Sequence, residues 1–295
     1  MNQSKGAFFM TFKKIGYDDI SRIDSFLRSC DYGLCDYTPL VLILWSDFYD
    51  YSYAVENGVL FIRQRRAEKT EYLLPVTDET EGALKVLAEY CRRNGEDLNL
   101  VAVPEKYKER VERVLNRPLT DMGESDGDYV YAASDLVNLV GRKYNGQRNH
   151  LNRFKRDYPS AVFRRLKPED KDALREFLAE YHVNDTSETY LYDRKAVRTF
   201  IENFDKYSFL CGAVFLDKKI LAFSVGDVIG DTLFVHIEKC LRAYSGIGET
   251  INHDFVSEFV GDGVKYVNRE EDMGDEGLRK AKLSYFPTVR KKYQT

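Results

Sequence analysis

Thr232-Leu-Phe-Val-His-Ile-Glu-Lys239 is the stretch around which the chain is organised, because its apolar side chains alternate with mixed ones in the manner of a β-strand. Residues 240–248 follow it as a glycine-bearing loop. From Ile247 onward an apolar residue recurs every four positions as far as Phe259, and this period is typical of an amphipathic helix. The sequence therefore predicts a strand, a loop and a helix in direct succession.

The loop between the strand and the helix is a candidate anion-binding site. The first N–H groups of a helix have no partner within the helix, and the helix dipole is positive at that end. The two glycines of the loop would let the backbone approach a phosphate closely. The residues of this predicted site are Lys239, Arg242, Tyr244, Gly246, Ile247 and Gly248. The alternative is an ordinary strand-to-helix turn whose glycines serve only its geometry.

Length and composition limit the class of protein. At 295 residues the chain is long for one hydrophobic core, so two domains are expected. Hydrophobic residues make up 43% of it and no apolar run approaches the length that spans a bilayer, so a soluble globular protein is expected. Its five cysteines are scattered and form no C-x-x-C pair, which disfavours a disulfide framework or a zinc site and favours a reduced, cytoplasmic protein.

Both halves of the chain give the same order of elements: a strand, two helices, three strands, a helix, a strand, a helix and a strand. The elements expected in the first half are 11–15, a helix from Asp18, 39–48, 51–55, 59–64, 71–76, 80–92, 98–103, 105–115 and 128–132. Those expected in the second half are 162–166, 168–181, 193–203, 209–216, 220–228, 232–239, 248–260, 264–268, 276–284 and 288–293. This agreement predicts an internal duplication of one α/β unit, with domains at 1–133 and 134–295. The alternative is two unrelated α+β domains.

The order of elements resembles the GNAT acyltransferase fold, which implies a mixed α+β architecture of two tandem GNAT-like domains. In that superfamily a central strand, a phosphate-binding loop and the next helix form the acyl-CoA pyrophosphate site, with a pattern close to Arg/Gln-x-x-Gly-x-Gly/Ala. Ala243-Tyr-Ser-Gly246-Ile-Gly248 matches this pattern in its glycines, while the basic residue stands one place early, at Arg242. The resemblance implies that the loop 239–248 binds the donor.

Several longer motifs follow one another in the second half. They are Gly141-Arg-Lys-Tyr-Asn145, Arg148-Asn-His-Leu-Asn-Arg-Phe-Lys-Arg156, His236-Ile-Glu-Lys239, Asn268-Arg-Glu-Glu-Asp-Met-Gly274 and Gly277-Leu-Arg-Lys-Ala-Lys-Leu-Ser-Tyr-Phe-Pro287. Through these motifs, about residues 128–293 resemble the C-terminal domain of phosphatidylglycerol lysyltransferases. The duplicated arrangement also looks like the Fem-type peptidyltransferases, which use aminoacyl-tRNA. The resemblances imply direct transfer of an acyl or aminoacyl group, from acyl-CoA or aminoacyl-tRNA, to an amine or hydroxyl of a small molecule or lipid head group.

The two halves differ where the donor would bind. The first half has Pro75-Val-Thr-Asp-Glu-Thr80 in place of the glycine loop. Two acids without a glycine would repel a phosphate. We therefore expect one donor site per chain, in the second half, with the first half as a wall and partial acceptor surface.

Residues 135–158 join the halves and form a basic linker. Between positions 142 and 156 there are six cations and no acid. These cations and the histidine among them are Arg142, Lys143, Arg148, His150, Arg153, Lys155 and Arg156. Such a cluster favours a polyanion: CoA phosphates, a tRNA backbone or a lipid head group. The alternative is a solvated helix face paired with acids of the other domain.

Five successive polar residues, Asn268-Arg-Glu-Glu-Asp272, stand at the end of a predicted strand beside the central one. Ligands gather beyond the carboxyl ends of strands in open α/β sheets. The carboxylates that are candidates to take a proton from an attacking amine are Glu238, Glu270 and Glu271, with Asn268 and Arg269 as substrate contacts. The alternative is a turn whose acids offset the basic linker.

Two further residues are candidates for the site. Strict alternation puts His236 on the same strand face as Glu238, although a half-buried strand histidine is the plainer interpretation. Tyr285 ends the last helix before Pro287. The GNAT resemblance implies that this tyrosine protonates the leaving thiolate, and the plainer interpretation is aromatic packing.

Other chemistries have no support in the sequence, which contains no Walker loop, H-E-x-x-H, G-x-S-x-G or paired-cysteine motif. No metal is therefore expected. The alternative to a transferase is a protein that keeps the fold and binds CoA, a nucleotide or an anionic lipid without turnover.

Overall fold

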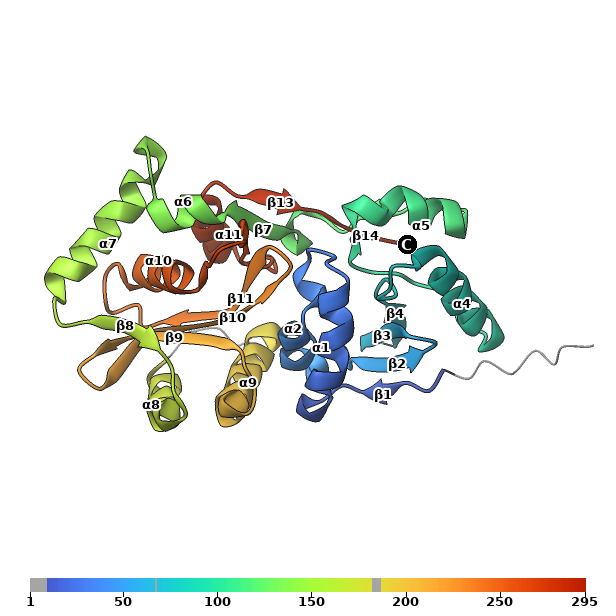
Figure 1. Ribbon diagram of the computed structural model, residues 1–295, viewed down its shortest axis with the longest axis horizontal. Coiled ribbons are helices and arrows are strands. Elements are labelled where there is room, and N and C mark those ends of the chain that lie inside the picture. Colours follow the sequence, from blue (N-terminus) through green and yellow to red (C-terminus); the bar gives the residue numbers. More distant parts are fainter. Residues whose placement is uncertain (1–9, 67, 182–186) are drawn as a thin grey trace, which may run out of the picture. The chain divides into compact units, whose positions relative to one another are not determined.

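The computed structural model describes residues 10–66, 68–181 and 187–295 (Figure 1). The chain divides into two compact units: unit 1 consists of residues 1–127 and 290–295, and unit 2 of residues 128–289. The division falls before the sequence-based boundary at residue 133, so that β7 (Asp128–Ala132) belongs to unit 2. The last residues of the chain return to unit 1.

Unit 1 contains an antiparallel sheet in the order β1-β2-β3-β4. Its strands are β1 (Lys13–Lys14), β2 (Ser52–Glu56), β3 (Val59–Arg66) and β4 (Lys69–Tyr72). Asn57 and Gly58, with φ of 51° and 77°, form the tight turn that the sequence predicts between β2 and β3. A second sheet has the order β5-β14-β6, with β14 (Lys292–Gln294) between β5 (Val103–Pro104) and β6 (Thr120–Asp121).

The helices of unit 1 are α1 (Ile20–Ser29), α2 (Pro39–Leu44), α3 (Ser46–Tyr49), α4 (Thr80–Arg93) and α5 (Lys108–Leu115). The single helix expected over 39–48 is thus interrupted at Trp45, where ψ is 7°. The strand expected over 98–103 is reduced to one bridge, from Leu100 to Tyr72, and the short β5. In both places the run of apolar residues in the sequence is longer than the regular helix or strand that forms.

Unit 2 is built on a sheet in the order β13-β7-β12-β11-β10-β9-β8. Its further strands are β8 (Val162–Arg165), β9 (Leu210–Leu216), β10 (Lys219–Ile229), β11 (Thr232–Cys240), β12 (Tyr266–Asn268) and β13 (Thr288–Arg290). Neighbouring strands from β8 to β11 are antiparallel, whereas β11 and β12 are parallel. The expected stretch of strand, loop and helix is confirmed, because β11 leads through a loop into α10 (Ile247–Phe259).

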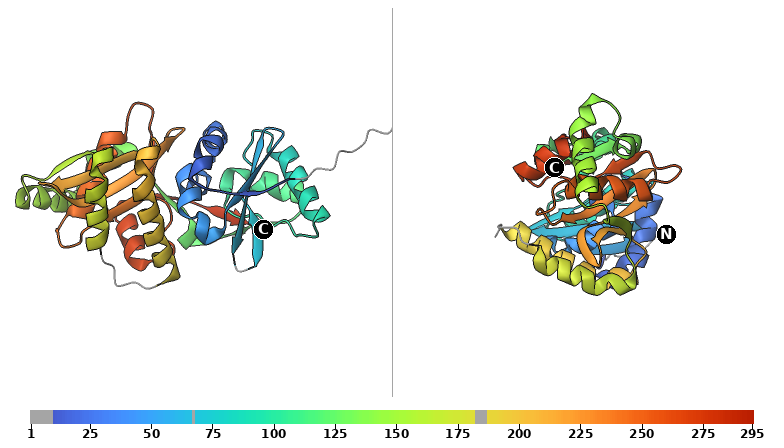
Figure 2. Two further views of the ribbon diagram at one scale, coloured as in Figure 1. Left: turned by 90° about the horizontal axis from the view of Figure 1, so that it is seen from below. Right: turned by 90° about the vertical axis from the view of Figure 1, so that its left-hand side faces the viewer.

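The other helices of unit 2 are α6 (Ala133–Asn138), α7 (Asn145–Asp157), α8 (Lys171–Glu180), α9 (Glu188–Asn203) and α11 (Glu276–Leu283). Figures 1 and 2 show α8 and α9 on one face of the sheet and α10 on the other. On the α10 face, Phe255 and Val256 pack with Leu233 and Val235 of β11, and on the other face Phe177 of α8 packs on Phe223 of β10. In the described part of the chain, no helix has the length and apolar content needed to cross a lipid bilayer.

Candidate active site

The central strand β11 contains an irregularity at His236. Its pairing with β10 sets Val225 opposite Ile237 and Gly226 opposite Val235, so that His236 is an extra residue without a partner in this register. This is a β-bulge, a device that re-aims side chains. The bulge requires a glycine opposite, since a Cβ on Gly226 would lie 2.2 Å from a carbonyl oxygen of β11.

The bulge reverses which side chains face α10. Val235 packs in the core cluster that includes α10, and Glu238, three positions later, accepts a hydrogen bond of 3.3 Å from Asn252 of α10. His236 instead stacks on Phe234, with ring centroids 6.2 Å apart. The expectation that His236 and Glu238 share one face of the strand is therefore wrong, because strict alternation fails across a bulge.

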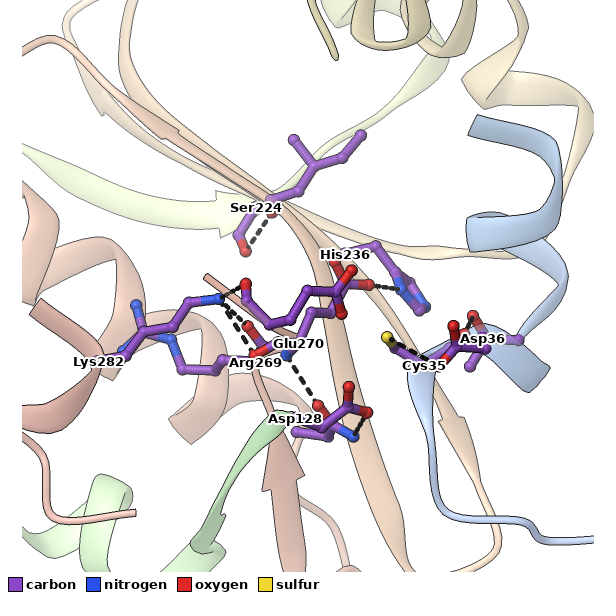
Figure 3. A network of polar contacts seen from close by, with 12 residues as sticks. Cys35, Asp36, Asp128, Ser224, His236, Arg269, Glu270 and Lys282 are labelled. Atoms are coloured by element: carbon purple, nitrogen blue, oxygen red, sulfur yellow. Dashed lines mark hydrogen bonds and ion pairs between the residues drawn. The ribbon is translucent and has the colours of Figure 1, made fainter. Parts of the chain in front are cut away.

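His236 forms a close pair with Glu270, which follows β12 (Figure 3). Its Nδ1 lies 2.7 Å from Oε1 of Glu270, and its side chain is 0% exposed. Its Nε2 is buried and has no hydrogen-bond partner among the described residues. Burial raises the pKa of Glu270, and the hydrogen bond with His236 opposes this shift. An imidazole that a carboxylate holds at one nitrogen, and whose other nitrogen has no hydrogen-bond partner, has the arrangement of a general base.

A second histidine–carboxylate pair in unit 2 differs from the pair of His236 and Glu270. His253 of α10 has Nδ1 2.8 Å from Asp254, and its Nε2 lies 3.1 Å from the carbonyl oxygen of Val137. Both nitrogens of this ring are therefore used by the fold. His150 is exposed on α7. Of the histidines in the described residues, only His236 is buried with one nitrogen left open.

The loop that carries Glu270 is fastened by Lys282 of α11. The Lys282 ammonium donates to the carbonyl oxygens of Arg269, Glu270 and Glu271, at 2.6, 3.2 and 2.6 Å (Figure 3). Glu270 has φ of 59°, a conformation that few residues other than glycine adopt. Lys282 is buried, although its sequence neighbourhood of charged residues gives no signal of burial.

Asn268 supports the same loop. Its side-chain oxygen accepts from the backbone N–H of Glu270 at 2.8 Å, and its amide nitrogen donates to Asp128 at 2.7 Å. Asn268 therefore positions Glu270, and Glu271 is half-buried beside it. The sequence analysis offered Asn268 as a substrate contact, whereas in the structure its side chain binds within the fold.

Arg269 and Glu238 form a second ion pair, in which Nη2 of Arg269 lies 2.8 Å from Oε1 of Glu238. The guanidinium carbon lies 5.9 Å from the ring centroid of Tyr131 and 5.4 Å from that of Tyr285. Burial alone would lower the pKa of Arg269, but Glu238, Tyr131 and Tyr285 together outweigh it and the pKa is raised. Nη1 of Arg269 is buried without a hydrogen-bond partner among the described residues. Tyr285 is buried as well, and burial raises its pKa.

A third polar contact closes the loop on its far side. Asp272, whose side chain is 0% exposed, is bound at 2.7 Å by Nε of Arg279 and at 2.6 Å by the hydroxyl of Tyr129. Burial alone would raise the pKa of Asp272, but these hydrogen bonds outweigh it and the pKa is lowered. The sequence analysis identified neither Arg279 nor Tyr129, because they approach Asp272 from separate elements.

The predicted phosphate loop is packed against α7. Gly246, with φ of 85°, is the residue before α10, and a Cβ on it would lie 2.3 Å from the carbonyl oxygen of His150. Ile247 is buried in a cluster with Phe154, and Tyr244 packs on Tyr158 with ring centroids 5.3 Å apart. Close approach of two backbones thus accounts for Gly246 without a ligand.

The cations expected at this loop are only partly available. Lys239 forms an ion pair of 2.8 Å with Asp193 of α9. Burial alone would lower the pKa of Lys239, but Asp193 outweighs it and the pKa is raised. Arg242 is exposed. A Cβ added to Gly248 would have the sulfur of Cys240 as its nearest neighbour, at 3.9 Å.

The basic linker is likewise partly committed to the fold. Arg148 donates to the carbonyl oxygens of Leu139 and Gly141, and so fastens the loop before α7. Lys143 pairs with Asp135 at 3.1 Å, and Arg153 with Asp157 at 3.5 Å. Arg142 is exposed on the same segment. The acids of these pairs, Asp135 and Asp157, belong to the linker itself and lie on either side of the stretch 142–156.

Residues 31–295 match the family described as "Phosphatidylglycerol lysyltransferase, C-terminal". A conserved protein of unknown function from Bacteroides thetaiotaomicron VPI-5482 has 30% sequence identity and a TM-score of 0.85, over 97% of this chain and 99% of that one. The structure of L-PGS from Bacillus licheniformis has 15% identity and a TM-score of 0.67, over 96% and 93% of the two chains. FemX has 9% identity and a TM-score of 0.60, over 97% of each chain.

These similarities confirm the expected fold, a mixed α+β architecture of two tandem GNAT-like domains, and the expected resemblance to lysyltransferase and Fem-type structures. An uncharacterized protein from Mycoplasmoides gallisepticum is 25% identical over 171 residues. The match spans about half the length of that curated relative, 54% of it.

Proposed function

The chain belongs to the phosphatidylglycerol lysyltransferase C-terminal family, and on that premise we propose that it transfers an aminoacyl group from aminoacyl-tRNA to an amine or hydroxyl acceptor. Family and fold support the broader class, an aminoacyl- or acyltransferase of GNAT-like type. The observation that carries the proposed chemistry is the pair of His236 and Glu270, in which Nε2 of the imidazole is buried without a partner among the described residues.

In this proposal His236 is the general base. Glu270 holds Nδ1–H, which leaves the lone pair of Nε2 for the proton of the attacking group. The acceptor oxygen or nitrogen bonds to the ester carbonyl carbon as its proton passes to Nε2. The carbon–oxygen bond to the tRNA ribose then breaks, and the ribose oxygen takes the proton from the imidazolium.

The charge that develops on the carbonyl oxygen needs donors. Two candidates lie near β11: the backbone N–H of His236, at the bulge, and Nη1 of Arg269, which has no other partner among the described residues. Tyr285 keeps the Arg269 guanidinium in place through its ring face. The predicted role of Tyr285 as a thiolate acid has no use when the leaving group is a ribose hydroxyl.

Acyl-CoA receives less support as the donor. The space beside Gly246 is filled by the backbone of His150, and Lys239 is paired with Asp193. Glu249 in the first turn of α10 adds a negative charge where a pyrophosphate would bind. The loop 239–248 is therefore poorly equipped to hold the CoA pyrophosphate, which favours the donor used by the Fem-type proteins that the sequence resembles.

The test is a transfer assay with tRNA charged by a mixture of radiolabelled amino acids, with phosphatidylglycerol vesicles and soluble amines as separate acceptors. We expect the wild-type protein to transfer label, and His236→Gln and Glu270→Gln to lower kcat by about 10²- to 10⁴-fold. His253→Gln is the matched control, because that ring has both nitrogens bound by the fold. It should keep the wild-type rate.

Three results would contradict the proposal. Transfer from acetyl-CoA but not from aminoacyl-tRNA would show that the donor is acyl-CoA. Full activity of His236→Gln would show that His236 is not the general base. Binding of CoA, nucleotide or anionic lipid with no transfer from either donor would favour the non-catalytic alternative.

A further inference from the structure

Two neighbouring segments of unit 2 expose large apolar side chains. Val140, in the connection between α6 and α7, is 72% exposed, and Phe286, after α11, is 54% exposed. Leu283, at the end of α11, is 49% exposed. Single exposed apolar residues are ordinary on protein surfaces, so the question is whether these three form one surface.

Contacts between the two segments join them. The ring of Phe286 lies 5.8 Å from that of Tyr144, and the ammonium of Lys143 lies 5.5 Å from the Phe286 ring centroid. Gln147 donates to the carbonyl oxygen of Ser284 at 2.8 Å. We call Val140, Leu283 and Phe286 the apolar tip.

The backbone is strained where the tip is displayed. Leu139 and Phe286 have φ of 48° and 56°, a left-handed conformation that bulky residues rarely adopt. Gly141, with φ of 93°, follows Val140, and Arg148 holds the carbonyl oxygens on both sides of Val140. One left-handed residue thus precedes the exposed Val140, and the other, Phe286, carries an exposed ring.

Cations surround the tip. Arg142 and Lys143 are exposed within the same connection, and Asp135 is the acid that pairs with Lys143. Apolar side chains beside basic ones are the pattern of a protein segment that enters the interface of an anionic bilayer. A nucleic acid would use the cations and aromatic rings but would leave Val140 and Leu283 in water.

We propose that the apolar tip docks unit 2 on the surface of an anionic lipid bilayer. Val140, Leu283 and Phe286 enter the boundary between head groups and acyl chains, and Arg142 and Lys143 lie against the negative head groups. This docking is independent of the transfer chemistry, because none of the tip residues belongs to the proposed active site.

Vesicle co-sedimentation of the full chain tests this proposal, with phosphatidylcholine vesicles that contain about a third phosphatidic acid. Phosphatidic acid has neither an amine nor a free hydroxyl, so it cannot act as the acceptor. The double variant Val140→Ser, Phe286→Asn should lower binding by about tenfold or more. Asparagine tolerates the left-handed conformation, so the variant should fold and melt like the wild-type protein.

Val162→Ser is the control, since Val162 of β8 is 56% exposed in the same unit and away from the tip. It should bind the vesicles as the wild-type protein does. The proposal would be overturned if the tip variant bound the vesicles as well as the wild-type protein does, or if the wild-type protein bound pure phosphatidylcholine equally well. Loss of binding only when tRNA is added would overturn it too. None of these results would alter transfer to a soluble amine, so the proposed function is tested separately.

Discussion

Lys282 places its ammonium group against the carbonyl oxygens of three successive residues, at 2.6, 3.2 and 2.6 Å. Lys282→Met would leave these oxygens without their donor. We expect a loss of about 2–4 kcal/mol in the free energy of unfolding, together with a lower transfer rate because Glu270 is no longer held beside His236. Urea denaturation and the transfer assay measure the two effects.

Lys280→Met in the same helix is the control for this change, because Lys280 is exposed. It should alter stability by less than about 0.5 kcal/mol. If both variants were equally stable, the carbonyl contacts of Lys282 would contribute nothing to the fold.

Asp272 makes the stability of unit 2 depend on pH. Hydrogen bonds from Arg279 and Tyr129 outweigh burial and hold the pKa of Asp272 below its usual value, so the folded state favours the carboxylate. Its contribution is complete above the unfolded pKa of about 3.9 and is lost as pH falls through the lower folded pKa. Asp272→Asn should therefore destabilise the protein most near neutral pH. Thermal melting from about pH 6 to 3 should show the gap between variant and wild type closing.

For single residues, the sequence points to the loop that carries Glu270, and the contacts that hold the loop are set by the fold. The run from Asn268 to Asp272 does follow a strand beside β11. How its members are oriented depends on Lys282 and Tyr129, which approach from other elements. Contacts of that kind arise from tertiary packing and leave no local pattern.

At the scale of elements, the junction of α7 and the loop before α10 depends on one glycine. Gly246→Ala would set a Cβ 2.3 Å from the carbonyl oxygen of His150, in a left-handed backbone. We expect a loss of about 2–4 kcal/mol in the free energy of unfolding, measured by thermal melting.

Gly248→Ala, two positions later, is the control. Its Cβ would have no neighbour closer than 3.9 Å, and the position lies in the first turn of α10. Alanine has the higher helix propensity, so this variant should be as stable as the wild type or more so, by up to about 1 kcal/mol. A larger loss at Gly248 than at Gly246 would mean that the loop is not held by α7.

The elements themselves follow from periodicity, which is local, and the stretch from β11 to α10 is confirmed. The bulge at His236 is not local, because it is defined by the register of β11 against β10. A glycine within a strand, as at Gly226, is the one sequence signal that could have suggested it. Without the bulge, His236 and Glu238 were assigned to one face.

For the whole molecule, the return of the chain to unit 1 completes the second sheet of that unit. β14 lies between β5 and β6, and Lys292 forms an ion pair of 2.7 Å with Asp36. Deletion of residues 290–295 should loosen unit 1 while unit 2 keeps its core. Hydrogen exchange should rise in peptides from β5 and β6 and stay low in those from β11 and α10. Equal protection in both units would contradict this expectation.

The position of β14 also has a consequence for biosynthesis. A ribosome delivers the chain from its N-terminus, and domains generally fold in that order. Here the middle strand of the second sheet of unit 1 is translated after every residue of unit 2. The nascent chain therefore carries an unfinished first unit while the second is completed, and the need for chaperone protection falls on the part that left the ribosome first.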